Sequence, residues 1–117
     1  MLRPQLPATK ISPTVDAQVA GFHSKIVEEV AAAVARDRVV VVGMAQNPVV
    51  KKARKFLHAA AVPCTYLEYG SYLGKWKERL AIKLWAGFPT FPMIFVDGTL
   101  EGGYTELQAV QKRGALK

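Results

Sequence analysis

The stretch of residues 85–104 limits the fold of this chain more than any other part of it. Pro89 and Pro92 lie close together there, and a residue that precedes proline is restricted to extended or turn conformations. Met93–Val96 follows as a short apolar run, which is typical of a buried β-strand. This half of the stretch therefore predicts an extended loop that leads into a strand.

The second half of the stretch carries the signals of a hairpin and of a sharp corner. Asp97 and Gly98 form a dipeptide that type I′ turns favour, because both central residues of such a turn need positive φ angles. A second short strand, residues 99–101, then runs into Gly102 and Gly103, where the missing side chains allow close backbone approach. We expect functional residues where the loop at Pro92 and this glycine corner face the rest of the chain.

Length and composition favour one globular domain with a basic surface. The chain has 117 residues, of which 50% are hydrophobic, and that is enough for a single core without disulfides. The longest apolar run, around residues 39–42, is far too short to span a bilayer, and we find no secretory signal. The net charge of +7 fits either an anionic partner or a well-solvated surface.

Cys64 is the single cysteine of the chain. One cysteine excludes an internal disulfide, a two-thiol redox site and a cysteine-based zinc site within one chain. It fits a protein of the reducing cytoplasm. We expect Cys64 itself to be a small, semi-buried residue.

The remaining sequence predicts alternating helices and strands after a loosely packed tail of residues 1–14. Asp16 suits the N-cap of the first helix, and Asn47, directly before Pro48, suits that of the second. Pro63 indicates an edge strand, and a helix that joins two strands implies a parallel pair. The predicted helices cover residues 16–36, 48–61, 71–86 and 105–113, and the predicted strands cover residues 39–42, 62–69, 93–96 and 99–101. The expected fold class is α/β, with a four-stranded mixed sheet and helices on both faces.

Apolar spacing predicts which helical side chains face the core. The predicted buried faces are Val19, Phe22, Ile26, Val30 and Ala33 in the first helix, Val49, Ala53, Phe56, Leu57 and Ala60 in the second, Leu73, Trp76, Leu80 and Leu84 in the third, and Leu107 and Val110 in the last. We also expect the other large aromatic side chains to be packed, namely Tyr66, Tyr69, Tyr72 and Trp85. Because the sheet should be covered by helices, an exposed aromatic platform for nucleic acid is not expected.

Four basic residues gather in the second predicted helix: Lys51, Lys52, Arg54 and Lys55. Positive charge close to a helix N-terminus opposes the helix dipole. The cluster therefore hints at an anion that is recruited there, although a solvated helix face accounts for it equally well.

Several of these features together resemble a known family. A strand is followed by a helix that starts at Pro48, residues 79–83 lie in the next predicted helix, and residues 87–103 combine a Thr-Phe-Pro loop, a hairpin and a glycine pair. This combination is similar to the glutaredoxins, and above all to the monothiol glutaredoxins. The resemblance spans residues 39–113 and implies a thioredoxin-like fold, with a glutaredoxin-like domain over residues 15–117.

The reactive thiol of that family has no counterpart at the matching position of this chain. The family carries Cys-Pro-Tyr-Cys or Cys-Gly-Phe-Ser after the first strand, and the match puts Asn47 and Val50 at the two cysteine positions. A lysine that commonly precedes the first cysteine is replaced by Met44. Neither Asn47 nor Val50 can form the thiolate that disulfide exchange needs, or ligate an iron–sulfur cluster.

Other parts of the family's glutathione site look present. Pro92 matches the family's cis-proline, so the backbone of Phe91 would meet the cysteinyl part of a bound peptide. Arg79 matches a basic residue that contacts the glycine carboxylate of glutathione, and Thr105 stands where many members have aspartate or serine. The resemblance thus implies a ligand site made of Asn47, Arg79, Phe91, Pro92, Gly102, Gly103 and Thr105.

Three functional hypotheses follow. The first is a glutaredoxin-like protein without the catalytic thiol, which binds glutathione, a protein thiol or an extended peptide but does not exchange disulfides. The second is a glutathione-dependent oxidoreductase or redox-regulatory protein that uses Cys64. The third is a basic protein-interaction module with an exposed edge strand. No metal site, membrane segment or further cofactor is expected, and the sequence leaves the oligomeric state open.

Overall fold

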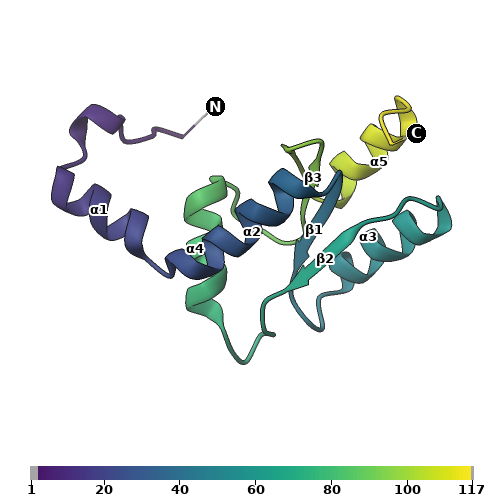
Figure 1. The fold of residues 1–117 in the computed structure, drawn as a ribbon, viewed down its shortest axis with the longest axis horizontal. Helices are drawn as coiled ribbons and strands as arrows, with labels where there is room; N and C mark the ends of the chain where they lie inside the picture. Colours follow the sequence, from purple (N-terminus) through teal and green to yellow (C-terminus); the bar gives the residue numbers. More distant parts are fainter. Residues whose placement is uncertain (1–2, 117) are drawn as a thin grey trace.

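The structure is a computed structural model that describes residues 3–116 of the chain (Figure 1). Met1 and Leu2 of the predicted tail, and Lys117 of the predicted domain, lie outside the described residues. Within the described range the elements follow in the order η1 (Ala8–Lys10), α1 (Pro13–Gly21), α2 (Ser24–Arg36), β1 (Val39–Gly43), α3 (Pro48–Ala59), β2 (Thr65–Glu68), α4 (Trp76–Ala86), β3 (Met93–Val96), β4 (Thr99–Gly102) and α5 (Tyr104–Lys112).

The strands form one four-stranded mixed sheet in the order β2-β1-β3-β4. β1 pairs in parallel with β2, where Val41 lies opposite Tyr66, and antiparallel with β3, where Val41 lies opposite Ile94. The predicted mixed sheet is therefore confirmed. The strand after Pro63 lies at an edge as predicted, although it begins only at Thr65.

Helices cover both faces of this sheet, as predicted (Figure 1). Successive side chains of a strand point to opposite faces. Val40 and Val42 pack with residues of α2 and α4, whereas Val39 and Val41 pack with residues of α3 and α5. All of these valines are buried, and this explains why β1 is apolar throughout instead of alternating with polar residues.

The predicted helix of residues 16–36 is wrong as a single element. The chain leaves the helix at Phe22, and His23 has a φ angle of 46°, so α1 and α2 are separate. Gly21, at the end of α1, has a low helix propensity, and the ring of Phe22 packs edge-on against His23 with centroids 4.8 Å apart. His23 Nδ1 also lies 3.7 Å from Glu78 Oε1, which holds the break close to α4.

Helix α1 begins earlier than predicted and contributes nothing to the core. Ser12, not Asp16, caps it, because Ser12 Oγ accepts a hydrogen bond of 3.2 Å from the backbone N–H of Val15. Val19, predicted to be buried, is 46% exposed, and α1 projects from the body of the molecule (Figure 1). Residues 3–10 are also exposed. The division into a tail of residues 1–14 and a domain of residues 15–117 stays a prediction.

The predicted third helix is shorter than expected, and its apolar stripe is exposed. α4 begins only at Trp76, because Lys75, with a φ angle of 60°, interrupts the chain before it. Arg79 and Ile82 are buried, whereas Leu73 is 95% and Trp76 61% exposed. The large side chains that were predicted to be packed here but are exposed are Leu73, Trp76, Leu80, Leu84, Tyr72 and Trp85. Apolar spacing therefore selected the wrong face of α4.

Helix α3 starts as predicted, at Pro48 with Asn47 as its N-cap, but its first buried residue is Val50 and not the predicted Val49. Val50 is buried together with Ala53 and Leu57, while Val49 is exposed. Val50 packs in the core cluster that also holds residues of α2 and α4. Val49 is thereby free to line a surface groove.

The hairpin turn between β3 and β4 has φ angles of 50° at Asp97 and 81° at Gly98, which agrees with the type I′ prediction. Helix α5 starts at Tyr104 and buries Leu107 and Val110 as predicted. Its N-cap is Gly103, so the helix begins one residue before the predicted range of 105–113.

Candidate ligand groove beside Pro92

A groove of about 480 Å³ lies between the first half of α3, the loop before β3 and the start of α5. We call it the Pro92 groove. Its lining residues are Val49, Lys52, Phe88, Thr90, Phe91, Pro92, Gly103, Tyr104, Thr105 and Glu106. It therefore brings together the predicted loop and the predicted glycine corner, which are separated by the β3–β4 hairpin in the sequence.

The loop side of the groove is held firmly by the core. Phe91 and Pro92 are buried, and the peptide bond between them is cis. Phe88 packs against the core shared by α2, α4 and the sheet. Lys83 Nζ lies 5.7 Å from the centroid of the Phe91 ring, a cation–π distance. These core contacts fix the position of the loop backbone at the edge of the groove.

The glycine corner is shaped by one acidic side chain. Gly102 has a φ angle of 125°, and a Cβ added to it would collide with the side chain of Glu106. Glu106 Oε1 accepts a hydrogen bond of 2.8 Å from the backbone N–H of Gly103. A Cβ on Gly103 would lie 3.6 Å from the carbonyl oxygen of Pro92, so the corner and the loop approach each other closely. Only residues without side chains fit this arrangement unstrained at Gly102.

The N-terminus of α3 is capped by Asn47, the residue that the family resemblance predicted at the first cysteine position. Asn47 Oδ1 accepts hydrogen bonds from the backbone N–H groups of Val49 (2.9 Å) and Val50 (3.1 Å). The same two N–H groups would stabilise a thiolate, because unpaired N–H groups at a helix start donate hydrogen bonds to a negatively charged group. Val50, which the resemblance predicted at the second cysteine position, is buried. The amide oxygen of Asn47 therefore accepts the hydrogen bonds that a thiolate at this position would accept, but it cannot act as a nucleophile.

Arg79 is directed to a different part of the molecule. Its side chain is buried, and Nη1 donates hydrogen bonds to the carbonyl oxygens of Tyr69 (3.1 Å) and Gly74 (2.6 Å). These bonds hold the irregular segment between β2 and α4, and they satisfy a guanidinium group that would otherwise be costly to bury. Arg79 does not line the Pro92 groove.

The structure thus brings together only part of the predicted ligand site. Phe91, Pro92, Gly103 and Thr105 line the groove, whereas Asn47, Arg79 and Gly102 do not. The lining residues that sequence reasoning did not assign to the site are Val49, Lys52, Phe88, Thr90, Tyr104 and Glu106. A signal for Glu106 was available, because an acidic residue three positions after an N-cap is the capping-box pattern.

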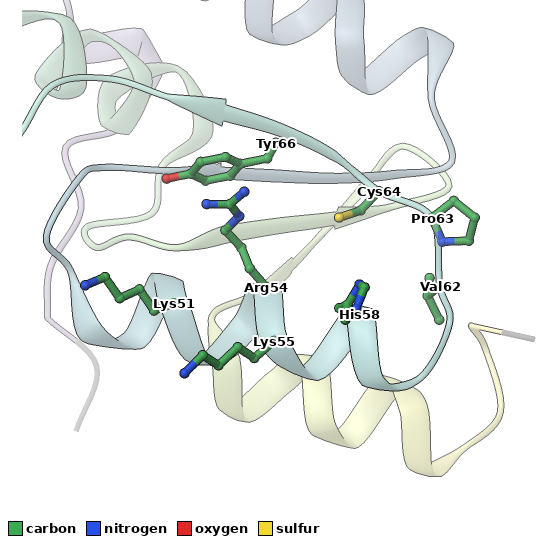
Figure 2. A pocket seen from close by; sticks show the side chains of 8 residues that line it. All are labelled: Lys51, Arg54, Lys55, His58, Val62, Pro63, Cys64 and Tyr66. Carbon is green, nitrogen blue, oxygen red and sulfur yellow. The ribbon is translucent and has the colours of Figure 1, made fainter.

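Cys64 lies in another pocket, between α3 and β2 (Figure 2). Its thiol is exposed, and partial burial raises its pKa above the ordinary value while the charge of Arg54 opposes this shift. A thiol with a raised pKa forms less thiolate near neutral pH and is a poor nucleophile. The direction of this pKa shift therefore weighs against a nucleophilic role of Cys64.

Two further classes of site find no support in the described part of the chain. Residues 3–116 contain no group of histidine, cysteine, aspartate or glutamate side chains placed to hold a metal ion. Over the same range no helix combines the length and the apolar character that crossing a membrane requires.

Comparison with solved structures defines the class of fold. The chain is similar to wheat glutaredoxin, with a TM-score of 0.67 and 22% identity over 80% of this chain and 87% of that one. It is similar to a buckwheat glutaredoxin–glutathione complex, with a TM-score of 0.68 and 16% identity over 86% of this chain and 88% of that one. A dithiolic glutaredoxin from Trypanosoma brucei brucei gives a TM-score of 0.61 and 29% identity over 74% of this chain and 90% of that one. The fold is therefore thioredoxin-like, of the glutaredoxin type.

Comparison of sequences then identifies the family. No family model matches the chain. A glutaredoxin-like protein of Dictyostelium discoideum is 48% identical over 108 residues, which cover 92% of this chain and 88% of that protein. The chain belongs to the glutaredoxin-like proteins, as the resemblance of residues 39–113 predicted, and it has a single cysteine that lies outside the family's cysteine positions.

Proposed function

We propose that this protein binds glutathione, or the cysteine-containing segment of an extended peptide, in the Pro92 groove and does not catalyse thiol–disulfide exchange. One observation carries the proposal. The groove is lined by Phe91, Pro92 and Gly103, while Asn47, which the family resemblance aligns with the first cysteine, caps α3 with its amide oxygen. The protein would then recognise a thiol-containing ligand without reacting with it.

An extended ligand can be held by backbone hydrogen bonds. A peptide that lies beside the Phe91 backbone would pair with it as an added strand, which gives affinity without charged side chains. Lys52 on α3 and the Thr105 hydroxyl on α5 line the same groove and would meet a carboxylate of the ligand. A glutaredoxin of similar fold has been crystallised with glutathione, and this supports the choice of ligand.

The capping hydrogen bonds of α3 and α5 limit the affinity that we expect for a ligand in the groove. The first N–H groups of α3 are occupied by Asn47, and the N–H of Gly103 is occupied by Glu106. A ligand must therefore displace Glu106 or use other donors, so we expect weak binding, with a dissociation constant on the order of 1 mM. Arg79, predicted to contact the glycine carboxylate, would first have to leave two backbone carbonyls.

The test is a titration of the ¹⁵N-labelled protein with reduced glutathione, followed by amide chemical shifts. Binding in the groove predicts shifts at Phe91, Gly103 and Thr105, with no change at Cys64. Lys52→Gln should weaken binding about threefold, the size expected for one solvent-exposed charge. Lys51→Gln is the matched control, because it removes the same charge from the adjacent residue, which lines the other side of α3. Unchanged spectra at 10 mM glutathione, a concentration about ten times the expected dissociation constant, would refute the proposal.

The second and third hypotheses from the sequence stay predictions. A redox role of Cys64 is favoured by its exposure but opposed by the raised pKa of its thiol. A mixed-disulfide reduction assay tests it, since activity that survives Cys64→Ser excludes this route. A basic interaction module would instead bind an acidic protein in a salt-dependent way that glutathione does not affect. The cytoplasmic location also stays a prediction.

A further inference from the structure

The proposed function does not explain the pocket between α3 and β2 (Figure 2). We call it the α3–β2 pocket. Its volume is about 640 Å³, within the range of sites that hold small organic ligands. The lining residues are Lys51, Arg54, Lys55, His58, Val62, Pro63, Cys64 and Tyr66.

The pocket has a basic end and an apolar end. The residues from α3 recur at helical spacing, so that their side chains share the face of the helix that looks toward β2. Figure 2 shows Lys51 and Lys55 toward the start of α3, with Arg54 under the Tyr66 ring, between these lysines and Cys64. Val62 and Pro63 lie at the opposite end, beyond Cys64. A ligand that fills the pocket must therefore combine negative charge at one end with an apolar part at the other.

The basic residues of this pocket have no ion-pair partner within residues 3–116. None of the ion pairs in that range involves Lys51, Arg54 or Lys55. The carboxylate nearest in sequence on β2, Glu68, accepts a hydrogen bond of 2.9 Å from the Tyr66 hydroxyl. Three like charges on one helix face repel each other, and this repulsion would be relieved by a bound anion.

Arg54 is held in position at the centre of the pocket. Its guanidinium carbon lies 3.9 Å from the centroid of the Tyr66 ring, which is a close cation–π contact. Its charge also acts on the thiol of Cys64, whose pKa it lowers against the effect of burial. A planar guanidinium fixed over an aromatic ring presents its edge to the pocket, and guanidinium edges match phosphate oxygens in geometry.

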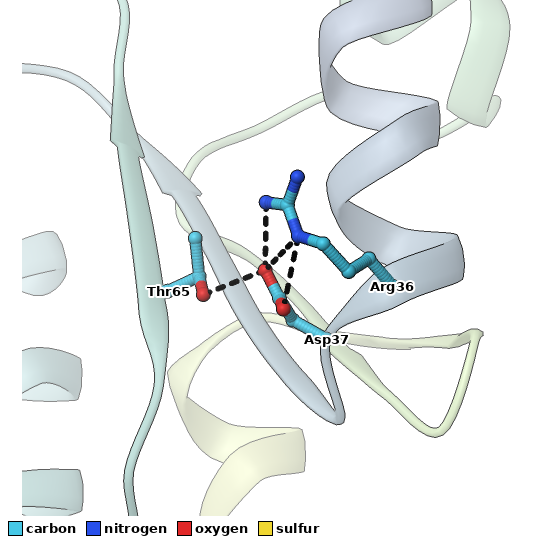
Figure 3. Close-up of polar contacts among 3 residues, drawn as sticks. All are labelled: Arg36, Asp37 and Thr65. Atoms are coloured by element: carbon cyan, nitrogen blue, oxygen red, sulfur yellow. Dashed lines mark hydrogen bonds and ion pairs between the residues drawn. The ribbon is translucent and has the colours of Figure 1, made fainter.

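The wall opposite α3 is also anchored. Asp37, which follows α2, accepts a hydrogen bond of 2.8 Å from Thr65 Oγ1 at the start of β2 (Figure 3). The same carboxylate receives hydrogen bonds from the Arg36 guanidinium, the shortest of them 2.9 Å long. The edge strand is thereby tied to the body of the molecule next to Cys64. The pocket is pre-formed on both walls, so little ordering would be needed on binding.

We propose that the α3–β2 pocket binds a phosphorylated small molecule of nucleotide size. Its phosphates lie among Lys51, Arg54 and Lys55. Its ring packs against Val62 and Pro63. A bare phosphate would leave the apolar end empty, and an uncharged ring would leave the basic end without a counter-charge. The site is separate from the Pro92 groove, so the two proposals stand or fall independently.

Isothermal titration calorimetry with ADP, adenosine and pyrophosphate tests the proposal. We expect saturable ADP binding, with adenosine and pyrophosphate each at least about tenfold weaker, because each lacks the part that one end of the pocket recognises. Heat changes indistinguishable from dilution at 5 mM ADP, a concentration well above about 1 mM, would overturn it. Pyrophosphate that binds as tightly as ADP would overturn the role of the apolar end, and adenosine that does so would overturn phosphate recognition.

The location is tested with variants and with the natural thiol in the pocket. Lys51→Gln combined with Lys55→Gln should weaken ADP binding at least about tenfold. Lys10→Gln combined with Lys25→Gln is the matched control, since it removes two exposed lysines elsewhere, and it should change ADP binding less than about twofold. ADP should also slow alkylation of Cys64 by iodoacetamide. Equal losses in both double variants, or an alkylation rate that saturating ADP leaves unchanged, would place the ligand elsewhere.

Discussion

Helix α3 separates two concave surfaces, and adjacent lysines of the helix belong to different ones. Lys52 lines the Pro92 groove, and Lys51 lines the α3–β2 pocket. In the groove, the polar groups at the two helix starts are already bonded within the protein, to Asn47 and to Glu106. In the pocket, by contrast, the charged groups of α3 lie outside every ion pair of residues 3–116.

This difference teaches how each surface would select a ligand. The groove is shaped mainly by backbone groups, so it would select a ligand by its extended backbone conformation more than by its charge. The pocket is shaped by side chains, and its positive groups have no ion-pair partner within residues 3–116, so a bound anion would supply their counter-charge. Variants that alter backbone geometry should therefore affect the groove, and variants that alter charge should affect the pocket.

The largest expected effect comes from Gly102→Ala. The new Cβ would collide with the Glu106 side chain, and alanine disfavours a φ angle of 125°. Backbone strain together with the loss of the Glu106 cap should lower the free energy of unfolding by about 3 kcal/mol. Urea denaturation measures this change. Gly74→Ala is the control, because a Cβ there meets nothing within 4 Å, and equal stability of the two variants would contradict the strain argument.

The double variant Asn47→Cys, Cys64→Ser tests whether the start of α3, beside the groove, can activate a thiol. The new thiolate would accept the two N–H hydrogen bonds that Asn47 now accepts, and these bonds lower the pKa of the thiol. Because the pKa falls, more thiolate is present below pH 7, and alkylation at pH 6 should be roughly 50-fold faster than at Cys64 of the unmodified protein. Iodoacetamide rates between pH 5 and 9 measure both thiols. Equal pH profiles would show that the α3 terminus does not activate a thiol.

Arg54→Gln probes the pocket and should have a smaller effect. The variant removes the guanidinium over Tyr66, so ADP binding should weaken about tenfold while glutathione binding stays the same. The pKa of Cys64 should rise further, because the Arg54 charge that lowers it is gone. Slower alkylation of Cys64 at pH 8 in the absence of ADP is the expected readout. Faster alkylation would contradict the position assigned to Arg54.

The two adjacent lysines allow a direct test of the separation. Lys52→Gln should weaken glutathione binding about threefold and leave ADP binding unchanged, and Lys51→Gln should do the reverse. Each variant removes one positive charge from the first turns of the same helix, so general electrostatic effects cancel in the comparison. If either variant weakened both ligands equally, the two surfaces would not be independent.

The smallest effect concerns the wall of the pocket. Hydrogen bonds from Arg36, and then from Thr65, lower the pKa of Asp37 below its ordinary value of 3.8. A lowered pKa in the folded state means that the stabilisation is present above the ordinary value and is lost as the pH falls through the folded one. Asp37→Asn should therefore flatten the pH dependence of the urea midpoint below about pH 4. Parallel curves for the two proteins would exclude this contribution.

The fold was more predictable than the site, for reasons that particular residues show. The unbroken valines of β1, the turn at Asp97 and Gly98, and the cap at Asn47 are local signals that require one conformation wherever they occur. The break at His23 was not predicted, because it depends on a ring contact with Phe22 and on Glu78 of α4, a residue far along the chain.

Helix α4 shows where apolar spacing fails. The leucines of its stripe are exposed, while Arg79 is buried because the carbonyl oxygens of Tyr69 and Gly74 happen to lie within hydrogen-bond distance. Apolar spacing in a sequence does not show which backbone groups will lie within hydrogen-bond distance of a charged side chain and so allow its burial. The same limit explains why Arg79 was assigned to a ligand.

The sequence by itself determined the class of fold, the family resemblance and the absence of a thiol at residue 47. Each of these follows from the identity of residues or from local backbone preferences. The tertiary structure decided that Gly103 caps α5, that Arg79 holds a loop, and that Lys51 and Lys52 serve two surfaces. These outcomes depend on which elements approach one another, and distances between remote segments are set by packing of the whole core and not by any local stretch of the chain.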